Sequence, residues 1–400
     1  MKIWYISDVD KASNRTSRVY YYAQKFIKKN CNFFLSTSSY DKWSKENHNS
    51  KKNFKFEIIN KINVIFIKSF KHNSQFLRSI SLLNICLKTY FLSHKLNKVD
   101  IIISSQPSLI AYIAMLIAKK RKIPFVYEIR DFWPHCLVHD KLISKTSVIF
   151  FILKKIEITL YKNANLIVTN LTNIKKYIDK KSKKKILYIP NPQVTKKKLS
   201  FEQNLKLYKN FKKKFTIIYA GGFSKAHNVQ LLLRALVYLK KKIIFKVILI
   251  GEGSEKNYCK EIIKKNDLNS YVKVLSHIPR NKITNIIMKS HLCIATTASN
   301  STYKYGISLN KLTEYMGCAK PIIITAKGHS NPVLKSKCGY CSKSNSPKDL
   351  ANKIIKIYKL SITQISQKGI NGYKYSNYNF NYNKLSNKYY SKLESLILNK

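Results

Sequence analysis

The chain has 400 residues, of which 45% are apolar and 19 are acidic, and its formal net charge at pH 7 is +56. This length suits two domains of ordinary size, and the apolar fraction excludes a disordered chain because it can fill two hydrophobic cores. Only seven of the 75 basic residues are Arg, and the lysines are scattered. Proteins that read bases and phosphates favour the planar fork of Arg, so we expect no nucleic-acid partner. Scattered Lys suits an anionic membrane surface better.

The eight cysteines show no disulfide framework, and the lone Cys338-Gly-Tyr-Cys341 has no second pair at zinc spacing. No secretion signal precedes the first apolar segment, and no apolar run reaches the roughly 20 residues that cross a bilayer. We therefore expect a cytoplasmic protein, either in solution or peripheral on the inner face of the cell membrane.

Short apolar segments alternate with helical patterns through the first half of the chain. Strands are expected at 2–6, 32–35, 101–103, 125–127, 166–168 and 186–189, and helices at 17–29 and 108–120. Short all-apolar strands between helices predict a parallel sheet that is covered on both faces. Pro190-Asn-Pro192 then interrupts the pattern, and the polar, Lys-rich stretch up to about Lys214 is typical of a hinge between domains.

The same alternation begins again in the second half. Strands are expected at 216–219, 245–250, 272–274, 292–294 and 321–324, helices at 229–240 and 308–317, and a helical tail from about 361. We predict two Rossmann-like domains facing across a cleft, with ligands at the carboxyl ends of the strands. The first spans 1–192 and binds the acceptor, the second spans 193–365 and binds the nucleotide, and helices at 366–400 pack back on the first.

The stretch from Tyr305 to Met316 has the strongest chemical signal. Ser308 is a plausible N-cap, and Lys311 and Glu314 share one face near the start of the helix. Free amides at a helix N-terminus together with Lys311 make a diphosphate site, and Glu314 could accept hydrogen bonds from two ribose hydroxyls. The alternative is an ordinary surface pair, but the flanking strand, turn and Pro321 favour a site.

This stretch resembles the Y-G-I-S-P-N-K-L-x-[DE]-Y-M-x-x-G-K-P signature of family 4 retaining glycosyltransferases. The branch it resembles most is similar to the fucosamine transferases of bacterial surface-polysaccharide synthesis. The second Glu of the family's Glu-x7-Glu motif matches Glu314, whereas the first falls on Gly306. By this resemblance the backbone amides around Gly306 and Ile307 could take over part of the recognition of the transferred sugar.

Residues 219–228 resemble the Y-A-G-N-x-G-x-A-Q-G loop of the same branch. Most family members clamp the pyrophosphate with Arg and Lys at positions that hold Gly222 and His227 here. Lys225 lies between them and could substitute, and Gly221 with Gly222 allows a phosphate to approach the backbone closely. The resemblance thus assigns Gly221, Gly222, Lys225, Gly306, Lys311 and Glu314 to donor binding.

Two segments of the first half resemble the acceptor side of these enzymes. Residues 128–134 resemble an E-x-R-D-x-W-P stretch, in which Asp131 could accept or orient the proton of the acceptor hydroxyl. Arg130 could contact a phosphate, and a structural salt bridge between Glu128 and Arg130 is the alternative. The resemblance makes Asp131, Glu128 and Arg130 the catalytic candidates. In the loop before the first helix, Arg15 and Arg18 could meet a lipid diphosphate, and a solvated basic loop is the alternative.

Asp8-Val-Asp10 looks like the metal-binding D-x-D of other transferases, but it ends the first strand and has no carboxylate cluster beside it. We therefore expect no bound metal. The apolar residues of 79–96 could lie on a membrane, and ordinary helix packing is the alternative.

The resemblance covers nearly the whole chain and implies a metal-independent hexosyltransferase of the GT-B fold. It would move a sugar from a nucleotide-diphospho-sugar to a lipid-linked glycan in O-antigen or capsule synthesis, with retention and without a cofactor. Two other functions remain open. One is a sugar-nucleotide epimerase of the same fold, and the other is a non-enzymatic basic protein that binds nucleic acid or a membrane surface.

Overall fold

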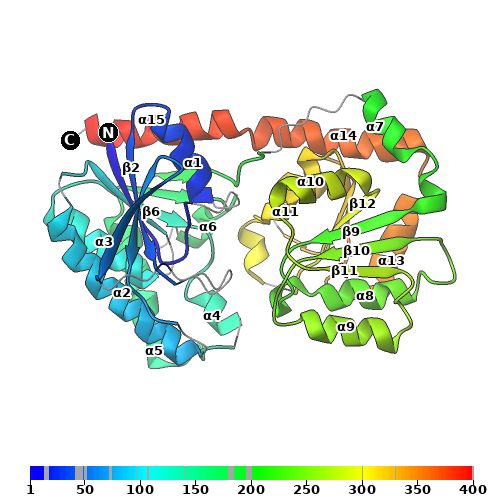
Figure 1. The fold of residues 1–400 in the computed structure, drawn as a ribbon, viewed down its shortest axis with the longest axis horizontal. Coiled ribbons are helices and arrows are strands. Elements are labelled where there is room, and N and C mark those ends of the chain that lie inside the picture. The colour runs from blue at the N-terminus through cyan, green and yellow to red at the C-terminus, as the bar shows by residue number, and fades with distance from the viewer. Residues whose placement is uncertain are drawn as a thin grey trace. The chain divides into compact units, whose positions relative to one another are not determined.

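The computed structural model describes residues 1–398, with gaps at 13–17, 41–47, 49–51, 72–73, 97, 106–107, 140, 179–183, 195–200, 300 and 329. The chain divides into two compact units. The first unit comprises Met1–Pro190 and Asn383–Lys400, and the second comprises Asn191–Tyr382. Each unit is built around one sheet with helices on both of its faces (Figure 1).

The first unit contains an eight-stranded sheet of order β3-β4-β2-β1-β5-β6-β7-β8. Its strands are β1 (Lys2–Ile6), β2 (Asn32–Ser38), β3 (Phe54–Ile59), β4 (Ile62–Ile67), β5 (Ile101–Ser105), β6 (Phe125–Ile129), β7 (Leu166–Thr169) and β8 (Ile186–Tyr188). All neighbours are parallel except the edge hairpin β3–β4. The strand order reverses between β1 and β5, which is the switch point where such sheets bind ligands.

Helices cover both faces of this first sheet. They are α1 (Arg18–Ile27), α2 (Gln75–Lys95), α3 (Ser108–Lys120), α4 (His135–His139), α5 (Val148–Asn163), α6 (Lys175–Ile178) and α15 (Tyr382–Leu398). Helices α1 and α15 pack on one face through Tyr22, Phe26, Tyr389 and Leu393. Figure 1 shows α2, α3 and α5 side by side on the opposite face, with α3 in contact with both neighbours.

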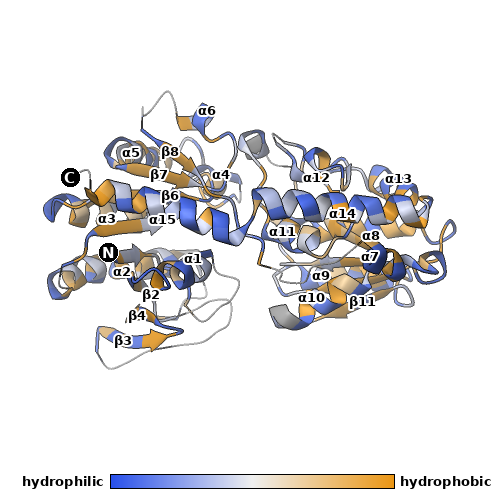
Figure 2. Cartoon of the chain, turned by 90° about the horizontal axis from the view of Figure 1, so that it is seen from above, coloured by the Kyte–Doolittle hydropathy of each residue, from blue (hydrophilic) through white to orange (hydrophobic). Residues whose placement is uncertain are grey.

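The second unit contains a six-stranded sheet of order β11-β10-β9-β12-β13-β14, all parallel. Its strands are β9 (Thr216–Ala220), β10 (Lys246–Ile250), β11 (Val272–Leu275), β12 (Leu292–Ala295), β13 (Ile322–Ile324) and β14 (Gly339–Cys341). Most residues of β9, β10, β12 and β13 are apolar and buried, as is typical of strands that are covered on both faces, and Figure 2 shows strands of the protein largely in orange. The order reverses between β9 and β12, so the segments that follow these two strands flank the switch point of the second unit.

The helices of the second unit also form two layers. They are α7 (Phe201–Tyr208), α8 (Val229–Val237), α9 (Lys256–Lys265), α10 (Arg280–Lys289), α11 (Asn310–Gly317), α12 (Pro332–Lys335), α13 (Pro347–Tyr358) and α14 (Ile362–Asn379). One core lies between the sheet and α8, α9 and α13, and another lies between the sheet and α10, α11 and α12. Among the described helices of the chain, none combines the length and the apolar character needed to cross a lipid bilayer.

The C-terminal tail is divided differently from the sequence expectation that 366–400 pack back on the first domain. Helix α14 belongs to the second unit, where it packs on α7 and α11, and Gly369 lets it approach the backbone at Ala319. Only α15 packs on the first unit. The expected hinge also contains more structure than its lysines suggested, because α7 lies within it and buries Asn204 and Tyr208.

Candidate functional site

The loop after β9 is held at the switch point of the second unit by the neighbouring loop after β10. The amide of Gly221 donates to Ile250 O at 2.9 Å, and the amide of Phe223 donates to Glu252 O at 2.8 Å. Gly253 has a φ of +153°, and a Cβ there would lie 2.1 Å from Phe223 O. Only glycine therefore allows the two loops to pair so closely, which fixes the Gly221-Gly222 backbone in place.

Lys311, in the first turn of α11, lies beside this loop. Its side chain is only 8% exposed, and its Nζ lies 4.0 Å from the centre of the Tyr219 ring. A Cβ added to Gly221 would stand 2.6 Å from the same Nζ, which places the amine directly against the loop. Among the described residues Nζ has no hydrogen-bond partner. Burial lowers the pKa of Lys311 from 10.5 to about 7, although Glu314 opposes this shift.

A buried amine with three unused donors is costly, and a ligand that supplies acceptors would offset this cost. The N-terminus of α11 adds to this donor set, since its N-cap, Leu309, makes no side-chain cap. Ser308, the N-cap expected from the sequence, precedes the helix by two residues and accepts a hydrogen bond from Asn191 Nδ2 at 3.2 Å. The amides at this helix end point to an anion site next to Lys311.

Glu314 lies one turn after Lys311 on α11, at the edge of the buried region, and is partly exposed. The carboxylate of Glu314 raises the pKa of Lys311, against the larger lowering by burial. A carboxylate in this position can accept hydrogen bonds from two neighbouring hydroxyl groups. The structure thus brings Lys311 and Glu314 of the sequence prediction to one edge of the second sheet, with Gly221 beside the amine.

His227 lies on the other side of the loop. A Cβ added to Gly222 would stand 3.4 Å from the His227 ring, and Ser224 Oγ and His227 Nδ1 are 2.8 Å apart. Burial, assisted by the charge of Lys311, lowers the pKa of His227 to about 4, so this imidazole is neutral at pH 7. Sequence reasoning noted His227 only as a departure from the family pattern, and it did not identify Tyr219 as the ring under Lys311.

Two other predicted donor residues lie at the margin of this group. Lys225 is exposed in a short 3₁₀ turn of the same loop. Gly306 is buried and has a φ of +136°, and its amide donates to Tyr303 O at 3.0 Å. The part of Gly306 in sugar recognition stays a prediction.

The charged residues that follow β6 in the first unit form a buried ion-pair network. Glu128 is 2% exposed and accepts from Arg18 Nε at 2.5 Å and from Arg130 Nε at 3.2 Å. Arg130 also holds Asp10 through two hydrogen bonds of 3.0 and 2.9 Å. Tyr5 Oη receives a further bond from Arg130 at 2.6 Å. This geometry ties β1, α1 and β6 together.

Arg18 and Glu128, two of the predicted acceptor-side residues, therefore have a structural role in this network. Arg18 is 7% exposed and also donates to Pro190 O at 2.9 Å, so it lies in the interior and not in a solvated loop. Glu128 is enclosed by the same network, whereas Arg130 is partly exposed. Asp131, the next residue, is exposed and remains accessible to an acceptor. Arg15 lies outside the described residues.

Asp8, which follows β1 at the switch point of the first unit, is a residue that sequence reasoning set aside. Its Oδ1 is buried and accepts no hydrogen bond from the described residues, while Asp10 is held by Arg130. The carboxylates of Asp8 and Asp10 are thus in different surroundings. In the described ranges, no group of three His, Cys, Asp or Glu could hold a metal. Burial raises the pKa of Asp8 to about 6, although Arg78 opposes the shift.

Asp8→Asn is expected to raise the free energy of unfolding at pH 8 by about 1–3 kcal/mol, at about 1.4 kcal/mol per unit of pKa. The pKa of Asp8 in the folded state exceeds its ordinary value of 3.8, so ionisation costs stability above pH 6. That cost fades as the pH falls from about 6 to about 4. Urea unfolding at pH 8 and pH 4 measures the gain, and an equal gain at both pH values would contradict the prediction.

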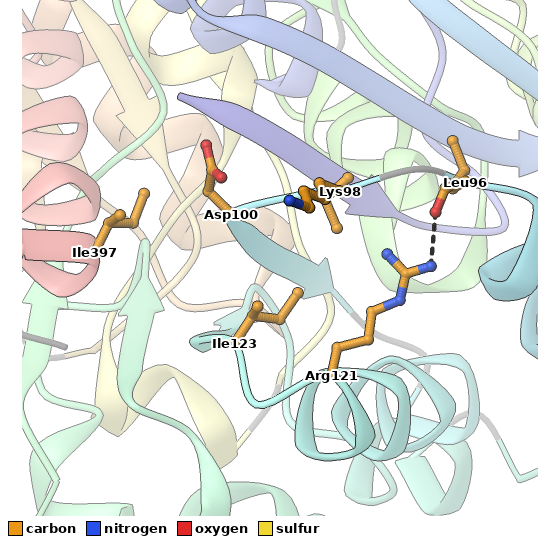
Figure 3. A pocket seen from close by; sticks show the side chains of 7 residues that line it. Leu96, Lys98, Asp100, Arg121, Ile123 and Ile397 are labelled. Atoms are coloured by element: carbon orange, nitrogen blue, oxygen red, sulfur yellow. Dashed lines mark hydrogen bonds between the residues drawn. The ribbon is translucent and has the colours of Figure 1, made fainter.

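A hollow of about 450 Å³ in the first unit lies away from these residues (Figure 3). It is lined by Leu96, Lys98, Val99, Asp100, Arg121, Ile123 and Ile397. Asp100 and Ile123 precede β5 and β6, so the hollow lies at the amino ends of the strands, whereas ligands of such sheets bind at the carboxyl ends. Arg121 has a structural role in this hollow, because its guanidinium donates hydrogen bonds to the carbonyl oxygens of Ser93 and Leu96.

Comparison with known proteins connects the second unit with a family. Residues 200–374 match the family model described as "Glycosyl transferases group 1". The matched residues include both segments of the candidate site, the loop after β9 and the start of α11.

Other similarities extend over more of the chain. An "Uncharacterized glycosyltransferase MJ1069" of Methanocaldococcus jannaschii is 26% identical over 258 residues, which span 63% of this chain and 64% of that protein. A sucrose-phosphate synthase from Thermosynechococcus elongatus has a TM-score of 0.76 at 14% identity, with both chains fully covered. Anabaena Alr3699/HepE in complex with UDP-glucose has a TM-score of 0.70 at 16% identity, with 99% and 100% covered. The predicted α/β fold of the GT-B glycosyltransferases is thereby confirmed.

Proposed function

We propose that this chain is a hexosyltransferase that takes its sugar from a nucleotide-diphospho-sugar. The observation that carries the proposal is the buried amine of Lys311, which lies against the Gly221-Gly222 backbone at the switch point of the second unit. A diphosphate is the ligand that suits this place, since it supplies acceptors to the amine and to the helix amides together. Glu314 is then assigned to the hydroxyl groups of the ribose.

The same residues account for how the reaction is accelerated. When the bond between sugar and diphosphate breaks, negative charge grows on the leaving phosphate. Lys311, the amides at the start of α11 and the Gly221-Gly222 loop stabilise this charge from fixed positions, and no metal is needed for it. A neutral His227 beside the loop adds a hydrogen-bonding group without a second positive charge to repel Lys311.

The acceptor is assigned to the first unit. Asp131, exposed directly after the buried network, is the group that accepts or orients the proton of the attacking hydroxyl. The resemblance to transferases of surface-polysaccharide synthesis supports a lipid-linked glycan as acceptor, transfer with retention, and a role in O-antigen or capsule synthesis on the inner face of the cell membrane. These assignments belong to the proposal.

A panel of nucleotide-sugars offered with lipid-linked acceptors tests this function. UDP-sugars come first because the Anabaena protein similar to this chain was solved with UDP-glucose. Product with the sugar attached to the acceptor is the expected result. Conversion of the donor alone into another sugar-nucleotide would instead show an epimerase, and failure of the chain to bind any nucleoside diphosphate would overturn the proposal.

Glu314→Ala is expected to weaken binding of the nucleoside diphosphate by about 10- to 100-fold, because hydrogen bonds to a charged group contribute about 1.5–3 kcal/mol. Glu314→Gln should retain part of the affinity, since its amide oxygen still accepts. Calorimetric titration measures both, and Glu202→Ala, an exposed acid on α7 of the same unit, is the control. Equal affinities for Glu314→Ala and the control would remove Glu314 from the donor site.

A further inference from the structure

One side of the first unit, where α2, α3 and α5 lie side by side over the sheet (Figure 1), exposes several large apolar side chains. We call it the α2–α5 face and define it by six exposed apolar residues, Phe76, Leu83, Leu87 and Phe91 on α2 and Phe151 and Ile152 on α5. Each of these side chains is more than half exposed. Isolated apolar residues on a surface are ordinary, but a continuous set over neighbouring helices marks a site of interaction.

Helix α2 presents its apolar stripe outward. Phe76, Leu83, Leu87 and Phe91 recur at the spacing of one helix face, and all four are exposed. The opposite face packs on the unit and buries Ile85, Cys86 and Leu92 together with Ser81, Thr89 and Ser93. A helix that serves only its own core buries its apolar residues and exposes polar ones. The exposed apolar stripe of α2 is therefore available to a partner outside the unit.

The charges of this face indicate which partner fits. The same three helices carry exposed basic residues, among them Arg78, Lys95, Lys119, Lys155 and Lys162. Among the described residues of the three helices Glu157 is the sole acid, and it is fully buried, where it accepts hydrogen bonds from Tyr161 and Tyr177. An apolar strip on helices that carry these basic residues complements an anionic lipid surface, whereas a second copy would bring two sets of basic residues together.

We propose that the α2–α5 face binds the chain to the surface of an anionic lipid bilayer. The aromatic and Leu side chains of α2 and α5 enter the boundary between headgroups and acyl chains, and the exposed lysines of these helices meet the lipid phosphates. This rests on the proposed transfer to a lipid-linked acceptor, which gives such binding its purpose. It is tested without donor or acceptor, so a failure of membrane binding can be distinguished from a failure of the proposed transfer.

The test is flotation of the full chain with vesicles of phosphatidylglycerol and phosphatidylcholine, compared with vesicles of phosphatidylcholine alone. Two double variants remove the face, Leu87→Ser with Phe91→Ser on α2 and Phe151→Ser with Ile152→Ser on α5. The control, Tyr238→Ser with Ile244→Ser, removes an aromatic residue and an Ile that are 49% and 68% exposed on the second unit. All the substituted side chains are exposed, so folding is retained, which thermal unfolding verifies.

We expect the wild-type chain to float with the anionic vesicles, each face variant to bind about tenfold more weakly, and the control to bind as the wild type. Face variants that bind like the control, with binding that salt alone abolishes, would show that scattered lysines suffice and would overturn the proposal. A wild-type dimer that the face variants dissociate would show instead that the face joins two copies. Lys311→Met should float normally, because the donor site takes no part.

Discussion

Lys311→Met is expected to lower the transfer rate by about 10²- to 10³-fold, the usual cost of removing one fixed donor from a developing oxyanion. Its affinity for the nucleoside diphosphate should fall by about 10- to 100-fold, in line with the loss of a charge-assisted hydrogen bond. Met fills nearly the same volume as Lys and keeps the contact with the Tyr219 ring, so the loop after β9 stays in place. Only the charge and its donors are removed.

The folded state of Lys311→Met should at the same time be more stable than the wild type, by on the order of 2 kcal/mol at pH 6. The pKa of Lys311 is about 7 in the folded state, below its ordinary value of 10.5, so the buried ammonium costs stability in full below pH 7. That cost fades as the pH rises from about 7 to about 10.5, and the gain should be smaller at pH 9. Denaturant unfolding at both pH values measures it.

Nucleotide binding should take up a proton, because the diphosphate favours the charged form of Lys311 while the unbound amine is about half neutral at pH 7. Affinity is therefore expected to fall by about tenfold per pH unit above pH 7. Calorimetry in buffers of different ionisation enthalpy counts the proton. Wild-type affinity that does not change between pH 7 and pH 9 would contradict this.

Lys320→Met is the matched control for Lys311→Met. Lys320 is fully buried, its Nζ lies 4.9 Å from the centre of the Tyr208 ring, and burial lowers its pKa to about 8. It precedes β13, at the amino ends of the strands, whereas Lys311 lies at their carboxyl ends. Removing the charge of Lys320 should stabilise the unit without changing nucleotide affinity. Equal losses of affinity in both variants would show that Lys311 acts through the fold alone.

Local sequence patterns were sufficient for the fold because the alternation of short apolar strands and helices is itself local. They failed where lysines mask the pattern. In α7, Asn204 and Tyr208 are buried one turn apart, but the lysines around them made the segment look like a hinge. The tail was divided wrongly for a related reason, since Gly369 reveals the close packing of α14 only through its contact with Ala319.

The donor site was predictable in part because Lys311 and Glu314 are three residues apart on one helix. The burial of Lys311 was not, since it depends on Tyr219, which is distant in the sequence. The surroundings of the charged run at 128–131 were not predictable for the same reason. Its partners, Arg18 and Asp10, are more than a hundred residues away, and spacing in the sequence does not show that they enclose Glu128.

Glu128→Gln is expected to lower the free energy of unfolding at pH 7 by about 3–5 kcal/mol, because it removes the carboxylate that the buried guanidinium of Arg18 shares with the partly exposed guanidinium of Arg130. Burial alone would raise the pKa of Glu128, but Arg18 and Arg130 outweigh it and hold this pKa below its ordinary value of 4.5. The network therefore contributes stability above that ordinary value. The contribution is lost as the pH falls through the lower pKa of the folded state. Urea unfolding at pH 7 and pH 3 should show a large difference between wild type and variant that shrinks in acid.

Asp131→Asn is expected to keep the stability of the wild type and to lose activity, because Asp131 is exposed. This residue lies three positions after Glu128. Its stability should stay within about 0.5 kcal/mol of the wild type, as for most surface substitutions, while its transfer rate falls. Glu128→Gln should keep its rate per folded molecule, measured below its unfolding temperature. A Glu128→Gln chain that is stable but inactive would return Glu128 to the catalytic group. A fully active Asp131→Asn would leave the acceptor without its proposed base and direct the search to Asp8, the buried carboxylate at the switch point of the same sheet.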